Sequence, residues 1–372
     1  MVHPKQKAGA IHLPDSELAK HTESGMKTVD KLLLLPEEVD AIQSLLRDIT
    51  SKYKSAEDDE FLSEACLYAH ELPRRIRKAV NSFKTTEPRS SVFLISGYPV
   101  VDSNIGRTPE HWKRKAEASP AMDVEALLIL LGALLGEALG WATQQGGSII
   151  HDILPIKECE NEQLGTGSLQ TLWWHNEDAF HNYRADYVGM ACLRNPDNVA
   201  TTIASIDDVR ISQADIELLF EPHFTIRPDN SHQEKNTPDK SDLSADPMDP
   251  LRRSYKGIAE MNEKPAKVSI LYGHPQSPYI RIDPYFMDPL DEGNPARQAL
   301  ERLIEEININ LSDVAMQPGE FLFIDNCKAV HGRKPFKARY DGADRWLKRI
   351  NVARDLRKSR SARANCNSRI IW

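Results

Sequence analysis

Two stretches decide which fold the sequence predicts: WWHNEDAF, residues 173–180, and EFLFIDNCKAVHGR, residues 320–333. Each begins with large apolar residues typical of a buried strand and continues into polar residues that include a histidine. Side chains at positions i and i+2 of an extended segment point the same way, so His175 and Glu177 can reach one point in space. The strong strand pattern of the second stretch could bring His331 across a barrel to that point.

Two histidines and one carboxylate form the ligand set of non-haem iron(II) oxygenases. Such a set leaves three positions on the iron for a keto acid and dioxygen. Alone, a His-x-Glu pair with a remote His-Gly is permissive, because it also arises by chance. The alternative interpretation of His175 is a strand histidine that is hydrogen-bonded to its neighbours. His175, Glu177 and His331 are the predicted catalytic and metal-binding residues.

A cationic residue further along the chain favours the iron interpretation. Arg345 could bind the distal carboxylate of 2-oxoglutarate, because a planar guanidinium binds carboxylates through two hydrogen bonds. Thr202, in VATTIAS, could add a hydroxyl. Considered alone, Arg345 would be taken for a surface cation in the charged run DGADRWLKR.

Working outward, the second half of the chain is a series of short apolar runs separated by turn residues. The predicted strands span residues 90–100, 148–154, 186–193, 200–206, 267–273, 279–283, 320–325 and 347–353. Many short strands of this kind suggest a sandwich or a jelly roll.

Helical spacing of apolar residues predicts the remaining regular structure. The predicted helices span residues 36–53, 58–83, 123–141 and 296–311. Pro36 and the two acids after it suit a helix N-terminus. Pro73 should bend or split the second helix, because proline removes a backbone donor and its ring clashes with the preceding turn.

Two polar segments fall outside this pattern. Residues 1–30 are predicted to be a flexible leader, and residues 31–372 a single oxygenase domain. Within that domain, residues 228–256 form a polar run between two predicted strands. A loop of this length in a compact domain is either disordered or a functional lid, and its position makes a lid insertion the prediction.

The chain has 372 residues, a net charge of −8 and five scattered cysteines without a Cys-x-x-Cys pair. It lacks the basic face of a nucleic-acid-binding protein, and its charge mildly favours a cationic small molecule. No disulfide framework and no signal peptide are expected. The longest apolar stretch, residues 126–136, is too short to cross a bilayer. We expect a cytoplasmic enzyme without nucleic-acid or membrane partners, whereas its oligomeric state stays open.

A co-linear series of motifs runs along about residues 58–370. It comprises HELPRRIR, GWATQQGG, ILPIK, HNEDAF with YRADYVG, LRNPDNVATT, IRPDNSH, and FIDN, AVHGR and RYDGADRWLKRINVARDL. The series resembles the clavaminate synthase-like branch of the Fe(II)- and 2-oxoglutarate-dependent oxygenases. Within that branch it is most similar to the hydroxylases of free L-arginine in antibiotic pathways, the viomycin-type arginine β-hydroxylases. The His-x-Glu pair, in place of the commoner His-x-Asp, is a trait of this branch.

The resemblance implies an α+β fold with a double-stranded β-helix (jelly roll) core, flanking helices and a lid loop. It implies that His175, Glu177 and His331 hold Fe(II), and that Arg345 and Thr202 hold 2-oxoglutarate. Dioxygen would be the co-substrate, with ascorbate as reductant in vitro. The implied activity is hydroxylation of an unactivated carbon, C3 or C4, of a free basic L-amino acid such as L-arginine.

The resemblance also implies a substrate site. Gln144, Glu177 and Arg349 would meet the α-amino and α-carboxylate groups of the amino acid. Asp229 and Asp283 would face its cationic side chain, and we expect both carboxylates to stay in contact with water until substrate binds, because unpaired buried carboxylates are costly.

One departure concerns the substrate. Two positions after Asp283 the related hydroxylases offer a second acid, whereas this chain has Tyr285. The alternatives are therefore an arginine desaturase, or a hydroxylase of lysine or of a cyclic arginine derivative. A metal-binding jelly roll without turnover is disfavoured by Arg345 and Thr202. Two other histidines, His151 and His181, are expected to be ordinary strand or loop residues.

Overall fold

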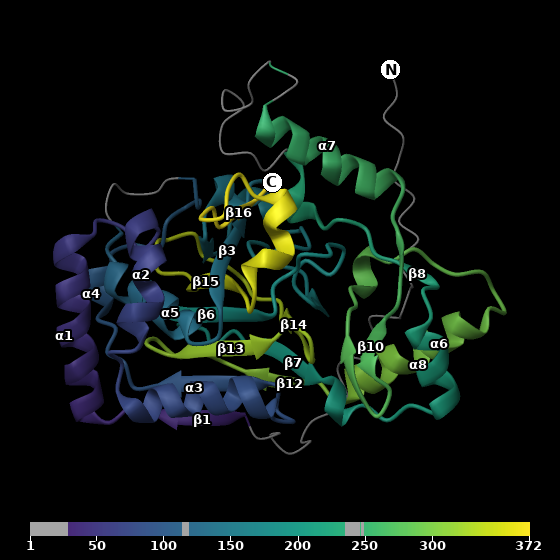
Figure 1. Cartoon of the computed structure of the whole chain (residues 1–372), viewed down its shortest axis with the longest axis horizontal. Helices are drawn as coiled ribbons and strands as arrows, with labels where there is room; N and C mark the ends of the chain where they lie inside the picture. The colour runs from purple at the N-terminus through teal and green to yellow at the C-terminus, as the bar shows by residue number, and fades with distance from the viewer. Residues whose placement is uncertain (1–28, 114–118, 235–245, 247–248) are drawn as a thin grey trace.

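The computed structural model describes residues 29–113, 119–234, 246 and 249–372. Strands from distant parts of the chain form two main sheets, and helices gather at both ends of them (Figure 1). This mixture confirms the predicted α+β class. The predicted leader, apart from residues 29 and 30, lies outside the described residues.

The larger sheet has eight strands in the order β1-β2-β13-β6-β15-β3-β16, with β4 paired to β15. Its strands are β1 (Asp30–Leu33), β2 (Val92–Ser96), β3 (Glu137–Trp141), β4 (Ile150–Ile153), β6 (Tyr187–Arg194), β13 (Phe321–Asp325), β15 (Trp346–Ala353) and β16 (Ile370–Ile371). The pairs β1–β2 and β3–β16 are parallel, and the other pairs are antiparallel. Strand β6 is buried along its whole length, as expected for the centre of a covered sheet.

The smaller sheet has four antiparallel strands in the order β12-β7-β14-β5. They are β5 (Leu172–His175), β7 (Thr201–Ser205), β12 (Ser312–Val314) and β14 (Ala329–Arg333). Apolar side chains of both sheets share one core cluster, to which β7 contributes Ile203, β13 contributes Leu322 and β15 contributes Leu347. The two sheets therefore pack face to face, as in a β-sandwich.

Helices α1 (Pro36–Lys52), α2 (Asp59–Ala69), α3 (Arg74–Thr86) and α5 (Met122–Ala133) share a core cluster with the larger sheet. Helix α1 has proline at its start and acids in its first turn, and Asp58 caps α2 by accepting hydrogen bonds from backbone N–H groups. The chain leaves the helix between Ala69 and Arg74, so the break predicted at Pro73 is confirmed.

The helix predicted over residues 123–141 is wrong in its second half. Helix α5 ends at Ala133, and residues 137–141 form strand β3, which pairs with β15. Helix α5 is buried on nearly all sides. Its sequence therefore lacks the alternation of polar and apolar faces that would distinguish the helix from the apolar strand after it. Gly136 lies at the break, where an added Cβ would be 2.2 Å from the Ala353 carbonyl oxygen.

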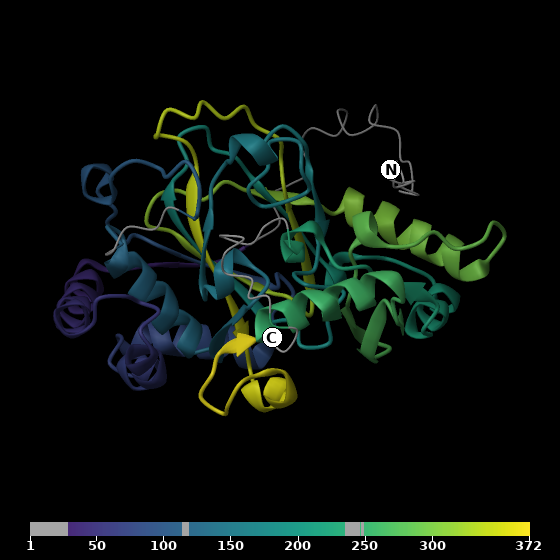
Figure 2. The ribbon, with the colours of Figure 1, turned by 90° about the horizontal axis from the view of Figure 1, so that it is seen from above.

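At the other end of the molecule a second core cluster joins α6 (Gln213–Phe220) and α8 (Pro295–Ile309) to the hairpin of β10 (Leu271–His274) and β11 (Ser277–Ile280). Seen from above, α7 (Pro250–Glu263) runs across this half of the molecule (Figure 2). The start of α7 shows that residues 250–256 of the predicted lid are helical, whereas residues 235–245 and 247–248 lie outside the described part. In the described part no helix combines the length and the apolar character needed to span a membrane.

Candidate active site

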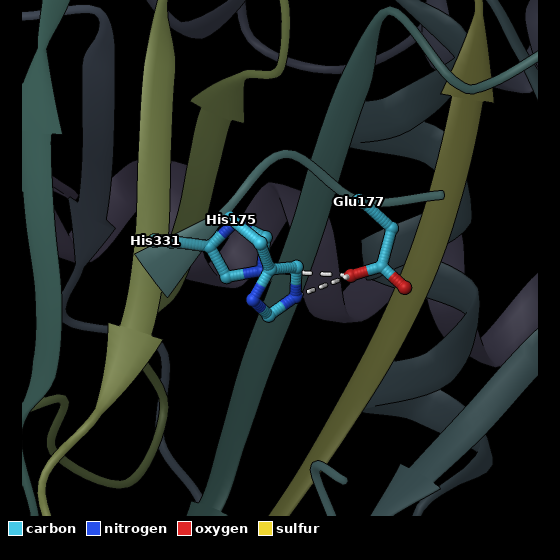
Figure 3. Close-up of side chains that lie close together, drawn as sticks. All are labelled: His175, Glu177 and His331. Atoms are coloured by element: carbon cyan, nitrogen blue, oxygen red, sulfur yellow. Dashed lines mark ion pairs between the residues drawn. The ribbon is translucent and has the colours of Figure 1, made fainter. Parts of the chain in front are cut away.

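His175 and His331 lie directly opposite one another on neighbouring strands. His175 is the last residue of β5, and its Cα pairs in register with that of His331 on β14. Their ring centroids are 4.9 Å apart. The carboxylate of Glu177 points toward both rings (Figure 3), with its Oε2 atom 3.5 Å from Nε2 of His331 and 4.0 Å from Nε2 of His175. The three predicted ligands therefore meet at one point.

A pair of buried asparagines holds the turn that carries Glu177. The Asn326 side chain accepts a hydrogen bond from the backbone N–H of Glu177 and donates one to its carbonyl. Asn176 points the other way and donates to the carbonyls of Asn326 and Ala329. This alternation keeps residues 175 and 177 on one side, as the i, i+2 argument predicts. The sequence reasoning missed Asn326, although it lies within the motif FIDN.

Glu177 has two oxygens in different environments. Its Oε1 atom lies 2.6 Å from the Arg349 guanidinium, whereas the buried Oε2 atom has no hydrogen-bond partner in the part of the chain that the structure describes. Burial alone would raise the pKa of Glu177, but Arg349 and the two imidazoles hold it well below its usual range. A buried, charged and unpaired oxygen that faces two imidazole nitrogens fits a divalent iron ion.

The orientation of His175 is set by a bond to the backbone. Its Nδ1 atom lies 2.7 Å from the Trp173 carbonyl oxygen. Since a carbonyl can only accept, Nδ1 carries the proton and Nε2 is left as the free lone pair that a metal needs. Gly332 lets β14 approach β5 beside this point, because an added Cβ would be 2.5 Å from the Leu172 carbonyl oxygen.

A cavity opens next to the three ligands and contains two buried guanidinium groups. Arg345 is 5% exposed, and within the described residues it forms no ion pair and no hydrogen bond through its Nε atom. Burial lowers the pKa of Arg345 to about 10 and that of Arg333 to about 9. Arg333 donates to backbone carbonyls, including that of Ser168. An unpaired buried cation calls for an anionic ligand, so Arg345 is not the surface cation of the alternative interpretation.

The structure corrects the hydroxyl residue by one position. Thr201 lines the cavity and pairs in register with Arg333, which also lines it. Thr202 pairs with Gly332, and neighbouring residues on a strand point to opposite faces. The side chain of Thr202 therefore points away from the candidate metal ligands, and Thr201 is the threonine that lines the same cavity as Arg345.

Asp229 and Asp283 also line the cavity, together with Tyr285. Asp283 ends the segment after β11, and its carboxylate accepts a hydrogen bond from the backbone N–H of Phe286. Asp283 is 7% exposed and lines the cavity, so contact of both carboxylates with water stays a prediction. Burial, together with the negative charge of Asp229, raises the pKa of Asp283 to about 6.

Gln144 is not among the residues that line this cavity; it lies buried behind the wall. Its amide donates to Asp178 at 3.2 Å and to Ser231 at 2.6 Å, and Ser231 is a wall residue. Asp178 also lies 2.9 Å from the fully buried His232 ring. The sequence did not predict this network, although Asp178 lies in the motif HNEDAF and His232 in the motif IRPDNSH.

His151 lies on strand β4 (Ile150–Ile153), as predicted, and its Nδ1 atom lies 2.8 Å from the Arg349 guanidinium. His181 is buried against the Trp141 ring, and burial lowers its pKa to about 3. Arg349 thus stands between His151 and the iron ligand Glu177.

Two histidines and one carboxylate at the end of facing sheets, beside a cavity with an unpaired arginine, define the class of non-haem iron oxygenases. The chain belongs to the family described as "Taurine catabolism dioxygenase TauD, TfdA family", whose model matches residues 121–351. Members of this class use the three open iron positions for a keto acid and dioxygen.

Two curated relatives and one solved structure cover nearly the whole chain. The chain is 43% identical to enduracididine beta-hydroxylase of Streptomyces hygroscopicus, over 92% of this chain and 99% of that protein. It is also 43% identical to L-ornithine/L-arginine 3-hydroxylase of Catenulispora acidiphila, with the same two coverages. The structure of the non-heme iron oxygenase OrfP with Fe, succinate and (3S)-hydroxy-L-Arg superposes with a TM-score of 0.86 at 40% identity, covering 92% of this chain and 100% of OrfP.

Proposed function

We propose that the protein is an Fe(II)- and 2-oxoglutarate-dependent oxygenase that hydroxylates C3 of a free basic L-amino acid, most simply L-arginine. The observation that supports the proposal is one cavity lined by three side chains that could hold a metal ion, by two carboxylates, and by a buried guanidinium that is unpaired within the described residues. One relative is named as a beta-hydroxylase of enduracididine and the other as a 3-hydroxylase of L-ornithine and L-arginine, which favours C3 over C4.

Different residues of the cavity have different roles in this proposal. His175, Glu177 and His331 hold iron, and Arg345 with Thr201 holds the distal carboxylate of 2-oxoglutarate. Iron(II) with 2-oxoglutarate supplies the chemistry that activates dioxygen and removes a hydrogen atom from carbon. The protein holds the amino acid still, keeps one C–H bond near the metal and excludes water.

The amino-acid end of the substrate lies against Glu177 and Arg349, with Gln144 in support. The cationic end faces Asp229 and Asp283, which form no ion pair with a lysine or arginine side chain in the described residues. A guanidinium can bond two carboxylates at once, which favours arginine over lysine.

Three features of the fold and setting belong to the same proposal. The two facing sheets form a double-stranded β-helix, residues 228–256 close over the bound amino acid, and the enzyme works in the cytoplasm as one domain over residues 31–372. The face-to-face packing of the sheets and the position of Asp229 and Ser231 at the cavity support the first two.

A cyclic arginine derivative is the second candidate substrate. The equal identity to enduracididine beta-hydroxylase and to the arginine hydroxylase favours neither relative. Tyr285, 40% exposed at the cavity, offers an aromatic face and one hydroxyl instead of a second acid. Such a wall accommodates a planar guanidine whether it is open or closed into a ring.

A substrate screen tests the proposal. The purified chain is incubated under air with Fe(II), 2-oxoglutarate, ascorbate and one of L-arginine, L-lysine, L-ornithine, L-citrulline or L-enduracididine. We expect succinate and a mass gain of one oxygen on a guanidino substrate. A mass loss of two hydrogens would indicate a desaturase, and a preference for citrulline would contradict the cationic substrate. No succinate with any substrate would indicate a metal-binding protein without turnover.

Asp283→Asn is the matched variant. Because it removes one charge and keeps the shape, we expect kcat/KM for L-arginine to fall at least about tenfold, the loss of one charge-assisted hydrogen bond. L-citrulline should lose far less, since it carries no cation. Equal losses for the two substrates would mean that Asp283 supports the fold of the site and does not recognise charge.

A further inference from the structure

Arg349 is held from two sides by residues of different segments. It lies on β15 directly opposite His151 on β4. One terminal nitrogen of its guanidinium lies 2.6 Å from Oε1 of Glu177, and the other lies 2.8 Å from Nδ1 of His151. A guanidinium can only donate, so the histidine nitrogen must be the acceptor of the second bond.

The other nitrogen of His151 fixes the tautomer. Nε2 lies 3.0 Å from the Ser148 carbonyl oxygen, which can only accept. Nε2 therefore carries the single proton, and Nδ1 presents its lone pair to Arg349. His151 is 3% exposed, and burial in one strand register removes its freedom to turn.

We propose that His151 is a positioning residue for the oxygenase reaction, acting through Arg349. By accepting one terminal N–H, it aims the rest of the guanidinium at two targets. The first is Oε1 of Glu177, which leaves Oε2 for the metal. The second is the α-carboxylate of the amino acid, since Arg349 lines the cavity and its Nε atom has no hydrogen-bond partner in the described residues.

The consequence is a chain of three groups, His151, Arg349 and Glu177, that couples amino-acid binding to the geometry of a metal ligand. Loss of the histidine acceptor leaves a buried guanidinium N–H unpaired, and such a group turns to find a new partner. The positions of both targets relative to Arg349 should then change. Arg345 forms no hydrogen bond or ion pair with these three groups in the described residues, so the affinity for 2-oxoglutarate should be kept. The inference rests on the proposed function for the second target only.

Two amide variants separate the acceptor from the shape of the ring. His151→Asn places its side-chain oxygen near the position of Nδ1 and can still accept from Arg349. His151→Gln reaches the position of Nε2, so it keeps the bond to Ser148 and loses Arg349. Ile150→Val, on the same strand and in the apolar core, is the packing control.

The readouts are the KM values for L-arginine and 2-oxoglutarate, the affinity for Fe(II), and the visible absorption of the anaerobic Fe(II)–2-oxoglutarate complex as L-arginine is added. We expect His151→Gln to raise the KM for arginine about tenfold, the effect of one lost charge-assisted hydrogen bond. Its Fe(II) affinity should fall several-fold and the arginine-induced change of the absorption should need more arginine, with the KM for 2-oxoglutarate within about twofold of wild type. His151→Asn and Ile150→Val should stay near wild type.

Equal behaviour of the Asn and Gln variants, whether both are impaired or both are intact, would overturn the proposal, because the acceptor would then not matter. If His151→Gln does not fold, His151→Leu takes its place in the same comparison. A wild type that does not respond to arginine at all would instead contradict the proposed function, and the Fe(II) affinities would still decide whether His151 positions Glu177 through Arg349.

Discussion

At the scale of single residues, the one carboxylate of Glu177 binds the Arg349 guanidinium and, in the proposed function, the iron ion as well. Arg349 takes Oε1, and the two imidazoles surround Oε2. The carboxylate can therefore stay charged although it is buried, because Arg349, together with His331 and His175, holds the pKa of Glu177 well below the usual range. An iron ion adds to a site whose charge balance already favours the ionised carboxylate.

We predict that His331→Ala, like His175→Ala, abolishes turnover and tight iron binding. Losing one of three protein ligands leaves a site that cannot compete for metal at micromolar concentration, because the two remaining side chains no longer enclose the ion. Iron content after desalting and succinate release measure the two effects. His274→Ala, at an exposed position on β10, is the control. Near-full activity of either ligand variant would refute the metal assignment.

Arg345→Ala should raise the KM for 2-oxoglutarate strongly and affect arginine much less. The lost bidentate bond to a carboxylate corresponds to about 1.5–3 kcal/mol, or roughly tenfold to a hundredfold in KM. Thr201→Val should raise the same KM by a smaller factor, whereas Thr202→Val, whose hydroxyl points away from the cavity, should leave it unchanged. An effect of Thr202→Val larger than that of Thr201→Val would contradict this placement.

At the scale of elements, much of the site could be predicted because the i, i+2 alternation of strands is local. It placed His175 and Glu177 together, and the strand pattern before His331 indicated the second ligand. Alternation could not tell Thr201 from Thr202, because that choice depends on the register of β7 with β14. The boundary between α5 and β3 could not be predicted for a similar reason. Both segments are apolar, and only the pairing of β3 with β15 shows where the helix stops and the strand begins.

Contacts between remote segments carry the parts that no local pattern predicts. Asn326 reaches Glu177, and His232 reaches Asp178 and Thr143, across long separations in sequence. Such pairs leave no periodic signal, so the second half of the substrate site could be named only by resemblance. Gln144 illustrates the limit: the resemblance implies that it meets the substrate, whereas in the structure its amide donates to Ser231 and Asp178 and it does not line the cavity.

His232 connects the segment Asn230–His232 to the turn after Glu177. Its Nδ1 atom lies 2.7 Å from the Thr143 hydroxyl, and its Nε2 atom lies 2.9 Å from the Asp178 carboxylate. We predict that His232→Phe lowers the free energy of unfolding by about 1.5–3 kcal/mol, since a buried charged group loses its partner. It should also raise the KM for arginine, because Asp229 begins the same segment. Urea denaturation measures the stability, and steady-state kinetics measure the KM. A loss of stability without a change in KM would mean that His232 stabilises the fold but does not position Asp229.

At the scale of the whole molecule, one cavity is lined by the three candidate metal ligands and Arg345, and a second cavity is lined by residues of the turn between β13 and β14. Asp325, Cys327 and Tyr272 line this second cavity. Asn326, between the first two, faces Glu177 instead. The turn thus lies between the candidate metal site and a second group of ionisable side chains, of which Asp325 is buried.

The last prediction concerns Asp325 and the pH dependence of that stability. Burial raises the pKa of Asp325 to about 6 from an ordinary value of 3.8, so the charged form is disfavoured in the folded state. Its cost is absent below pH 3.8, grows as pH rises through this interval, and is complete above pH 6, at about 3 kcal/mol as an upper bound. Asp325→Asn should therefore raise the free energy of unfolding at pH 8 and give about half that gain at pH 5. Urea denaturation at both pH values measures the difference, with Asp355→Asn as the control of opposite sign, because Arg357 lowers the pKa of Asp355 to about 2. A gain from Asp325→Asn that is the same at both pH values would show that its source is packing and not charge.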